Sequence, residues 1–480
     1  MADTQAVNTD VPHIVALRYA SQRMQSLWTP EHKVVLERRF WVAVLKAQKS
    51  LGFEVPEEAI ADYEAAVHDV DLESITAREV VTRHDVKARI EEFCDLAGHE
   101  YVHCGMTSRD LTENVEQLQI LESLKVIRSD LVMLIGGLAD SAEKYMSLVM
   151  TGRTHNVAAQ AVTLGKRFAD AASEAIIGFE RIVGLMQRYP LRGIKGPVGT
   201  QLDQLDLLGT SAAVAELEKL VAEHCGFTRV LPTSAQVYPR SLDLDVVAAL
   251  VQVVSAPASL TTTVRLMAGH DLVSEGSRDG QVGSSAMPHK VNARSCERVA
   301  ALKTVLDGYL AMAASLSGRQ WNEGDVSCSA ARRVMLPDAF LAADGLLHTT
   351  AAVLEDLRVS TKEIEAEFNR DLPKLITTRL LGAFVAAGMG REAAHRLLSE
   401  YTKPSTDAAV SPTADVLQLV DRLAADSRTP LSHNDLVGLV ATSEKFTGRA
   451  VEQVCDVVKR SRAIEELHPE AADQRSELRL

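Results

Sequence analysis

The stretch LKVIRSDLVMLIGGL, from Leu124 to Leu138, indicates the fold class of this chain. Its apolar residues recur at intervals of three and four, which places them along one side of a helix. The same spacing returns over residues 299–316, and residues 242–271 form a third long apolar segment, in which Pro257 predicts a kink. Long apolar stripes without strict alternation indicate a bundle of long helices. We therefore expect an all-α protein.

The composition agrees with packed helices. The 480 residues are 46% hydrophobic but only 4% aromatic, so the core consists mainly of aliphatic side chains, which suit helices better than a β-sandwich. This length allows one very large domain or two to three ordinary ones. The formal net charge of −14 argues against binding to nucleic acid or to an anionic membrane.

The cysteines and apolar segments bear on compartment. Six cysteines occur without a Cys-x-x-Cys pair or a histidine-rich motif, which is typical of reduced thiols and predicts no metal site. The first ten residues are polar and predict no signal peptide. The longest apolar stretch, residues 131–139, is too short to cross a bilayer. Together these features predict a soluble, cytoplasmic protein without a membrane segment.

Breaks in the helical patterns divide the chain into three segments. Pro30 and Pro373 are expected to interrupt shorter helices on either side of the bundle, and the charged tail at 465–480 is expected to fray. The predicted domains are an N-terminal helical domain (1–110), a central long-helix bundle with a loop at 280–294 (111–360), and a C-terminal helical domain (361–480).

The run GSSAMPHKVN, from Gly283 to Asn292, gathers several chemically useful side chains. Its glycine and Pro288 predict a loop. Lys290 and Asn292 are donors suited to a carboxylate. Ser284 can act as a nucleophile or base if nearby positive charge stabilises its alkoxide. A polar surface loop is the better interpretation for any single residue of this run, but not for the ten together.

Two further motifs contain candidate residues. His155 lies in TGRTHN, and a histidine exchanges protons near neutral pH, although a lone histidine is more often structural. In GMTSRD, Thr107 and Ser108 can bind carboxylate oxygens or cap the helix that follows. Ser108 or Asp110 is the expected cap, and both interpretations can hold at once.

Other polar runs are ambiguous by themselves. Arg83-His84-Asp85 can be a solvated cluster of charges. The arginines at 298 and 333 can bind a phosphate through two hydrogen bonds each. The run KGPVGT at 195–200 is glycine-rich but fits neither common phosphate-binding fingerprint.

Taken together, the motifs resemble the fumarase/aspartase superfamily, whose members eliminate fumarate from succinyl-type substrates. Within it they look most like the adenylosuccinate lyase family, of the bacterial type. The SSAMPHK run and the GRTH motif carry the resemblance most specifically, and it extends from about residue 18 to about residue 450. Ala293 departs from the pattern, because the family usually has proline there, and this loosens the exit of the loop.

The resemblance implies a catalytic pair and a set of substrate-binding residues. Ser284 would act as the general base, with His155 as the general acid that protonates the leaving nitrogen; which of the two takes the carbon proton is left open. The implied substrate-binding residues are Arg18, Tyr19, Arg83, His84, Asp85, Thr107, Ser108, Gln236, Lys290, Asn292, Arg298, Ser329 and Arg333.

The resemblance also implies the substrates and the assembly. The expected substrates are the nucleotides adenylosuccinate and SAICAR, with no metal or organic cofactor. The expected assembly is a homotetramer whose long helices form its core and whose active sites each draw on three subunits. Argininosuccinate lyase, carboxymuconate cycloisomerase and a non-catalytic scaffold like the lens crystallins are the alternatives. The Arg83-His84-Asp85 run favours a nucleotide, and retention of Ser284 and His155 argues against a scaffold.

Overall fold

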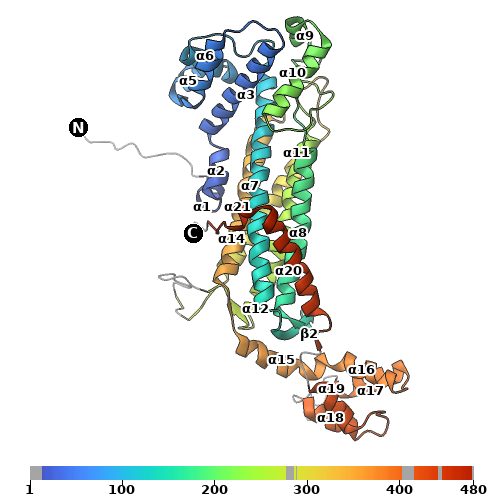
Figure 1. Cartoon of the computed structure of the whole chain (residues 1–480). Helices are drawn as coiled ribbons and strands as arrows, with labels where there is room; N and C mark the ends of the chain where they lie inside the picture. The colour runs from blue at the N-terminus through green and yellow to red at the C-terminus, as the bar shows by residue number, and fades with distance from the viewer. Residues whose placement is uncertain (1–12, 277–285, 288, 403–415, 442–445, 478–480) are drawn as a thin grey trace, which may run out of the picture.

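The computed structural model describes residues 13–276, 286–287, 289–402, 416–441 and 446–477 of the chain. Within these ranges the regular structure is almost entirely helical, and the strands form two short antiparallel pairs. The predicted all-α fold class is therefore confirmed. Figure 1 shows an elongated molecule, in which long helices run side by side between a group of short helices at each end.

The N-terminal elements reach from the side of the bundle to one end of the molecule (Figure 1). They are α1 (Ile14–Arg18), α2 (Gln22–Leu27), α3 (Pro30–Ser50), α4 (Glu57–Ala65), the 3-10 turn η1 (Ala66–His68), α5 (Leu72–Thr82) and α6 (Asp85–Ala97). Helices α1 and α2 lie at the side of the bundle, and α5 and α6 lie at the end. The expected break at Pro30 is confirmed, because this proline begins α3 and the Thr29 hydroxyl accepts a hydrogen bond from the backbone N of His32 at 3.2 Å.

The central bundle is built around α7. Its elements are α7 (Ser108–Lys144), β1 (Val149–Thr154), β2 (Val157–Thr163), α8 (Leu164–Arg188), α9 (Leu202–Leu208), α10 (Ser211–His224), α11 (Ser241–Val253), α12 (Ser255–Ala268), β3 (Val273–Ser274), α13 (Arg294–Leu316), α14 (Ser329–Asp356) and β4 (Arg358–Val359). The 37 residues of α7 give it a length of about 55 Å. The apolar stripe from Leu124 to Leu138 is buried along this helix, as predicted.

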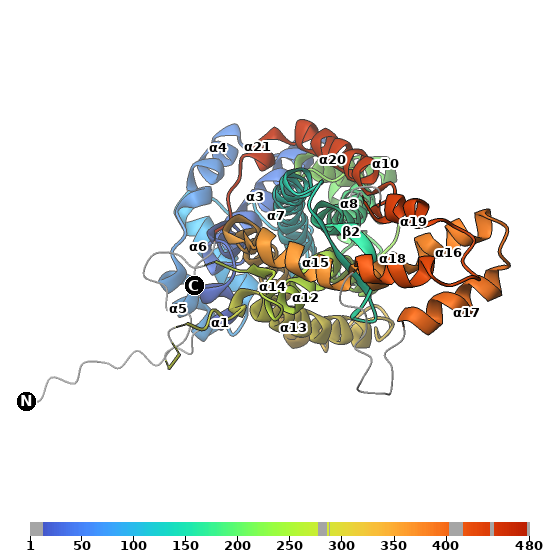
Figure 2. The ribbon, with the colours of Figure 1, turned by 90° about the horizontal axis from the view of Figure 1, so that it is seen from below.

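The C-terminal elements divide between two hydrophobic cores. They are α15 (Thr361–Leu375), α16 (Thr377–Ala386), α17 (Arg391–Thr402), α18 (Val416–Ala424), α19 (His433–Val440), α20 (Ala450–Leu467) and α21 (Pro469–Ala472). Helices α15 to α19 enclose a small core around Phe368, Leu380 and Leu419. Helix α20 instead returns to pack on α7 and α8, on the side of the bundle away from α13 (Figure 2). The division into three domains stays a prediction.

The structure tests two expected helix breaks. The apolar segment 242–271 is interrupted at Val254, between α11 and α12, three residues before Pro257. The expected break at Pro373 is wrong, because α15 continues through this residue to Leu375. A proline so close to the end of a helix interrupts little of it, since few turns follow.

The prediction that residues 131–139 are the longest apolar stretch is wrong. Ser241–Ala268 and Arg294–Leu316 are both long and apolar enough to cross a bilayer, judged by length and composition. Both pack within the bundle, but 56% of the apolar window is buried in the first segment and only 22% in the second. Helix α13 therefore presents an apolar surface to the outside. Its exposed residues include Ala300, Ala301, Thr304, Val305, Gly308 and Ala311.

A half-buried histidine lies at the junction between the N-terminal helices and the bundle. His103 adopts a left-handed backbone conformation with a φ of 69°. The indole N–H of Trp41 donates a hydrogen bond to its Nδ1 at 3.0 Å. Burial lowers the pKa of His103 from 6.5 to about 4, so the ring is neutral in the folded protein at neutral pH.

Acid is expected to destabilise the protein through this residue. Between pH 6.5 and pH 4 the unfolded histidine binds a proton that the folded one does not, so stability falls as the pH falls, by up to about 3 kcal/mol. A His103→Gln variant keeps an acceptor for Trp41 and should lose this dependence. Urea unfolding followed by tryptophan emission measures it, with the exposed His395→Gln as control. An equal pH dependence in His103→Gln and the native protein would contradict the assignment.

Candidate active site

A cavity of about 380 Å³ opens at the end of the bundle where α7 begins. Its lining comes from the α5–α6 junction, the start of α7, the loop before α11 and the first turns of α14. Among the residues predicted from sequence, it brings together Arg83, His84, Asp85, Ser108, Gln236 and Arg333. Residues separated by up to 250 positions thus meet at one place.

The α5–α6 junction presents the Arg-His-Asp run to this cavity. Arg83 ends α5 in a left-handed conformation with a φ of 52°, which turns the chain sharply into α6. His84 caps α6, and its Nδ1 accepts a hydrogen bond from the backbone N of Lys87 at 3.3 Å. The other ring nitrogen, Nε2, therefore carries the proton in the neutral ring and is a donor for a ligand.

Asp85 organises the positive charges at the junction. Its carboxylate pairs with Arg89 at 2.7 Å and lies 3.9 Å from the guanidinium of Arg333. Burial acts to raise the pKa of Asp85, but Arg89 and the backbone N of Val86 outweigh it and lower that pKa below its usual value. Asp85 is therefore a carboxylate at neutral pH, and it helps to orient Arg333 at the cavity.

The start of α7 is held by a buried carboxylate. Thr107 is the N-cap of α7, so the expected cap at Ser108 or Asp110 is wrong. Asp110 instead accepts a hydrogen bond from the backbone N of Thr107 at 2.8 Å. Its other oxygen accepts from Arg192 at 2.6 Å and from the backbone N of Lys195 at 2.9 Å. The KGPVGT run thus supports the helix that presents Ser108 to the cavity.

The opposite wall is formed by a loop and by α14. Gln236 is held by its backbone N, which donates to the carbonyl of Glu323 at 2.7 Å. Ser329 begins α14, and Arg333 follows four residues later, so the two side chains lie on one face of the helix. Beneath them the buried Arg332 pairs with Asp243 at 2.7 Å, which anchors this turn of α14.

A second group of predicted residues lies partway along the bundle. The guanidinium of Arg298 on α13 stacks over the ring of Tyr19, 5.2 Å from its centroid. Tyr19 packs its backbone against Gly345, sixteen residues or about 24 Å along α14 from Ser329. Burial lowers the pKa of Arg298, and the charges of Arg18 and Arg294 add to this effect. Such a gathering of cations suits an anion.

His155 lies at the far end of α7. It forms the tip of the β1–β2 hairpin together with Asn156, and both have positive φ, 52° and 59°, as a two-residue type I′ turn requires. The side chain is exposed. The hairpin is held by Arg153, whose guanidinium donates to Glu367 of α15 at 2.6 Å.

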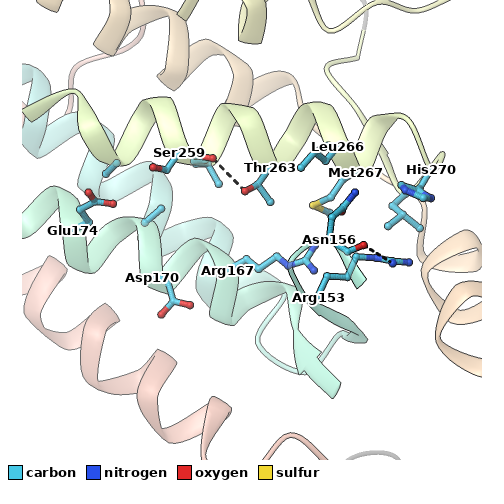
Figure 3. Close-up of a pocket in the computed structure, with 14 residues that line it drawn as sticks. Arg153, Asn156, Arg167, Asp170, Glu174, Ser259, Thr263, Leu266, Met267 and His270 are labelled. Atoms are coloured by element: carbon cyan, nitrogen blue, oxygen red, sulfur yellow. Dashed lines mark hydrogen bonds between the residues drawn. The ribbon is translucent and has the colours of Figure 1, made fainter. Parts of the chain in front are cut away.

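A cavity of about 380 Å³ lies beside this hairpin. Figure 3 shows Arg153, Asn156 and Arg167 on one side of it and Met267 and His270, at the end of α12, on the other. Burial lowers the pKa of Arg167, opposed by Glu367 and assisted by Arg153. The hairpin end of the bundle therefore also carries cations next to an open space.

The predicted loop at 280–294 is described only in part. Ser284 lies outside the described residues. Lys290 is exposed, and Asn292 is half-buried two residues before α13 begins. Ala293 has a φ of −78°, close to the value that proline imposes, so this position is compatible with the residue usual in the resembling family.

The cavity at the start of α7, the group around Arg298 and Tyr19, and the hairpin that carries His155 do not meet within one chain. Ser108 lies at the first residue of α7 and His155 follows its last turn, so about 55 Å of helix separates them. Figure 1 shows α5 and α6 at one end of the bundle and β2 at the other. One chain therefore holds the predicted residues in separate clusters rather than in a single site.

One buried cluster has the residue types of a metal site. Ligand atoms of Asp130, Asp344 and His348 lie within 4.8 Å of one another. The backbone N of Glu477, however, donates to Nδ1 of His348 at 3.0 Å. The proton of the neutral ring is therefore on Nε2, which faces Asp130 at 3.4 Å and leaves no lone pair for a cation. We interpret the cluster as a hydrogen-bonded one.

Comparison with known proteins gives the family. The model of the lyase family matches residues 13–306. The chain is 32% identical over 445 residues to the adenylosuccinate lyase of Schistosoma mansoni, covering 91% of this chain and 92% of that protein. It is 30% identical over 452 residues to that of Pyrococcus abyssi, covering 93% and 97%. The chain belongs to the adenylosuccinate lyase family.

Solved structures support the fold of this lyase. The 3-carboxy-cis,cis-muconate lactonizing enzyme of Pseudomonas putida superposes with a TM-score of 0.79 at 19% identity, covering 94% of this chain and 100% of that one. A fumarate lyase from Mesorhizobium sp. BNC1 gives 0.78 at 21%, covering 92% and 98%. These two structures show the shared fold, and the bacterial type stays a prediction.

Two cationic cavity residues of the enzyme were missed by the sequence analysis. Arg109 follows Ser108 in the GMTSRD motif and lines the same cavity, so the motif itself could have indicated it. Lys33 reaches the cavity from α3. It stands in an ordinary helical pattern, and nothing in the sequence near it distinguishes it from a surface lysine.

Proposed function

We propose that the enzyme converts adenylosuccinate to AMP and fumarate, and SAICAR to AICAR and fumarate, as a soluble enzyme of the cytoplasm. The observation that carries this proposal is the 30–32% identity to adenylosuccinate lyases over at least 91% of the chain. The arginine-lined cavity at the start of α7 supports it, because Arg83, Arg109 and Arg333 provide donors for an anionic nucleotide.

The reaction is a β-elimination. Ser284, as the general base, removes a proton from the carbon adjacent to the one that bears the nitrogen. The electron pair left there forms the C=C bond of fumarate. The C–N bond breaks, its electron pair stays with the nitrogen, and His155 donates a proton to this leaving nitrogen. Lys290 and Asn292 stabilise the extra negative charge on the adjacent carboxylate in the transition state.

The remaining residues bind the substrate. Thr107 and Ser108 hold a succinyl carboxylate at the N-terminus of α7, where backbone N–H groups favour an anion. Tyr19 and the arginines of the second group hold the phosphate, and His84 donates from Nε2. The last proposed substrate-binding residues are Arg83, Asp85, Gln236, Ser329 and Arg333. No step of this mechanism uses a metal or an organic cofactor.

A homotetramer would complete each site. The 55 Å between the ends of α7 supports this proposal, because a site with residues from both ends would need different chains, and antiparallel neighbours bring opposite ends of the bundle together. The apolar outward surface of α13 supports this proposal, since small side chains allow helices of neighbouring chains to pack closely. Three subunits would then contribute to each site.

A steady-state assay with purified protein tests the activity. We expect adenylosuccinate to give equal amounts of AMP and fumarate, and Ser284→Ala to abolish turnover while leaving the helical content unchanged. Argininosuccinate and carboxymuconate serve as comparison substrates. Turnover of either of these, with none of adenylosuccinate, would contradict the proposed substrate and favour one of the alternative lyases.

A further inference from the structure

The element that carries Arg18 and Tyr19 has little stability of its own. Helices α1 and α2 contain five and six residues, too few to form independently in water. No residue of α1 is buried, and Met24 alone is buried in α2. The position of Arg18 and Tyr19 must therefore come from contacts that this segment makes with the rest of the molecule.

Helix α14 supplies the first of these contacts. Asp338 accepts from the ring of His13 at 2.7 Å. One turn and a half further on, both oxygens of Asp344 bind Ser21, one from its backbone N at 2.6 Å and the other from its hydroxyl at 2.8 Å. The neighbouring Gly345 leaves room for Tyr19, whose backbone lies 2.9 Å from where a Cβ would be.

The C-terminal tail supplies the other contact. The expected fraying of this tail is wrong for residues 465–477, because α20 and α21 continue to Ala472 and residues 476–477 lie against α14 and α2. The carboxylate of Glu477 accepts from the backbone N of Gln22 at 3.0 Å, and its own backbone N donates to His348. One residue earlier, the hydroxyl of Ser476 donates to Glu355 at 2.7 Å.

The tail and Asp344 thus act on adjacent residues of the same turn. Ser21 and Gln22 begin α2, two and three residues after Tyr19, and each is held by a carboxylate from elsewhere in the chain. Asp344 is itself held in a buried cluster, where Nε2 of His348 lies 3.9 Å from it. We refer to Ser21, Gln22, Asp344 and Glu477 as the α2 clasp.

We propose that the α2 clasp positions Arg18 and Tyr19 for the phosphate of the nucleotide, with Glu477 of the C-terminal tail as a positioning residue. This inference rests on the proposed function for the identity of the ligand. Without the clasp, α1 and α2 lose part of their anchorage, and Tyr19 no longer stays fixed beneath Arg298. The phosphate would then have to order this segment on binding, which weakens affinity without changing the chemistry of the elimination.

The effect on phosphate binding is measured by calorimetry with AMP. We expect Glu477→Ala, and a chain ending at Asp473, to weaken AMP binding about three- to tenfold, the range for one or two lost hydrogen bonds. KM for adenylosuccinate should rise by a similar factor with kcat unchanged. Inhibition by fumarate, which has no phosphate, should stay the same. Glu466→Ala, an exposed glutamate on α20, is the matched control.

Hydrogen exchange gives a second measurement that does not depend on the reaction. Amides of residues 14–27 should exchange faster in Glu477→Ala, and those of α7 should not. Native-like AMP affinity in Glu477→Ala, or unchanged exchange at 14–27, would overturn the clasp. If the native protein binds no AMP, the proposed function fails, and the exchange measurement alone then decides whether the tail anchors this segment.

Discussion

Replacing His155 by asparagine is expected to lower kcat about 1000-fold, within the range for loss of a general acid. Asparagine is the informative substitution, because it adopts the left-handed backbone of this turn easily, whereas alanine would strain the hairpin. The exposed ring supports no core, so folding should be unaffected. Steady-state kinetics with adenylosuccinate and AMP calorimetry separate a loss of chemistry from a loss of binding.

The pH profile makes this test specific. A general acid gives up a proton in the transition state, so the native enzyme and the variant should differ in the pH dependence of kcat. Asn156→Gly, which keeps the turn and removes the neighbouring side chain, is the control. A near-native kcat in the His155→Asn variant would contradict a catalytic role for His155.

Two inactive variants are expected to restore activity when their subunits are mixed. If His155 and Ser284 of one site come from different chains, an equal mixture of His155→Asn and Ser284→Ala subunits carries both native residues in about one quarter of its sites. Activity should therefore rise from nearly zero to about a quarter of the native value after the two proteins are dissociated and reassembled together. Each variant taken through the same procedure alone is the control.

A second pair of inactive variants changes only residues that the structure describes. His84 and His155 lie at opposite ends of the bundle, so His84→Ala mixed with His155→Asn should complement in the same way. Native mass spectrometry verifies that mixed tetramers have formed. Mixed tetramers without any recovered activity would contradict a site shared between subunits.

The sequence predicted those features that depend on local patterns. The stripe from Leu124 to Leu138 indicated α7, because a helix that packs along its whole length repeats its apolar residues regularly. The Arg-His-Asp run and GMTSRD indicated residues that the structure brings to one cavity. The roles of His155 and Ser284 stay predictions, since nothing in one chain tests them.

Other features depend on contacts that no local pattern records. Lys33 joins the cavity only because α3 packs beside α7. The docking of Glu477 depends on a histidine 129 positions earlier in the chain. The apolar pattern of α13 looks the same whether its outward residues face a core or a neighbouring chain, so the sequence alone did not reveal that this surface is open in a single chain.

The hairpin that carries His155 packs against two hydrophobic cores, the large core of the bundle and the small core of α15 to α19. Val149 and Ala161 pack against the small core of α15 to α19, and Gln160 donates to Thr378 at 2.7 Å. A small core opens locally at a lower free-energy cost than a large bundle does. We therefore expect the small core to unfold before the bundle. Mild heat or denaturant is expected to displace the hairpin and His155 first, and a catalytic role of His155 predicts that activity is lost while the long helices are still intact.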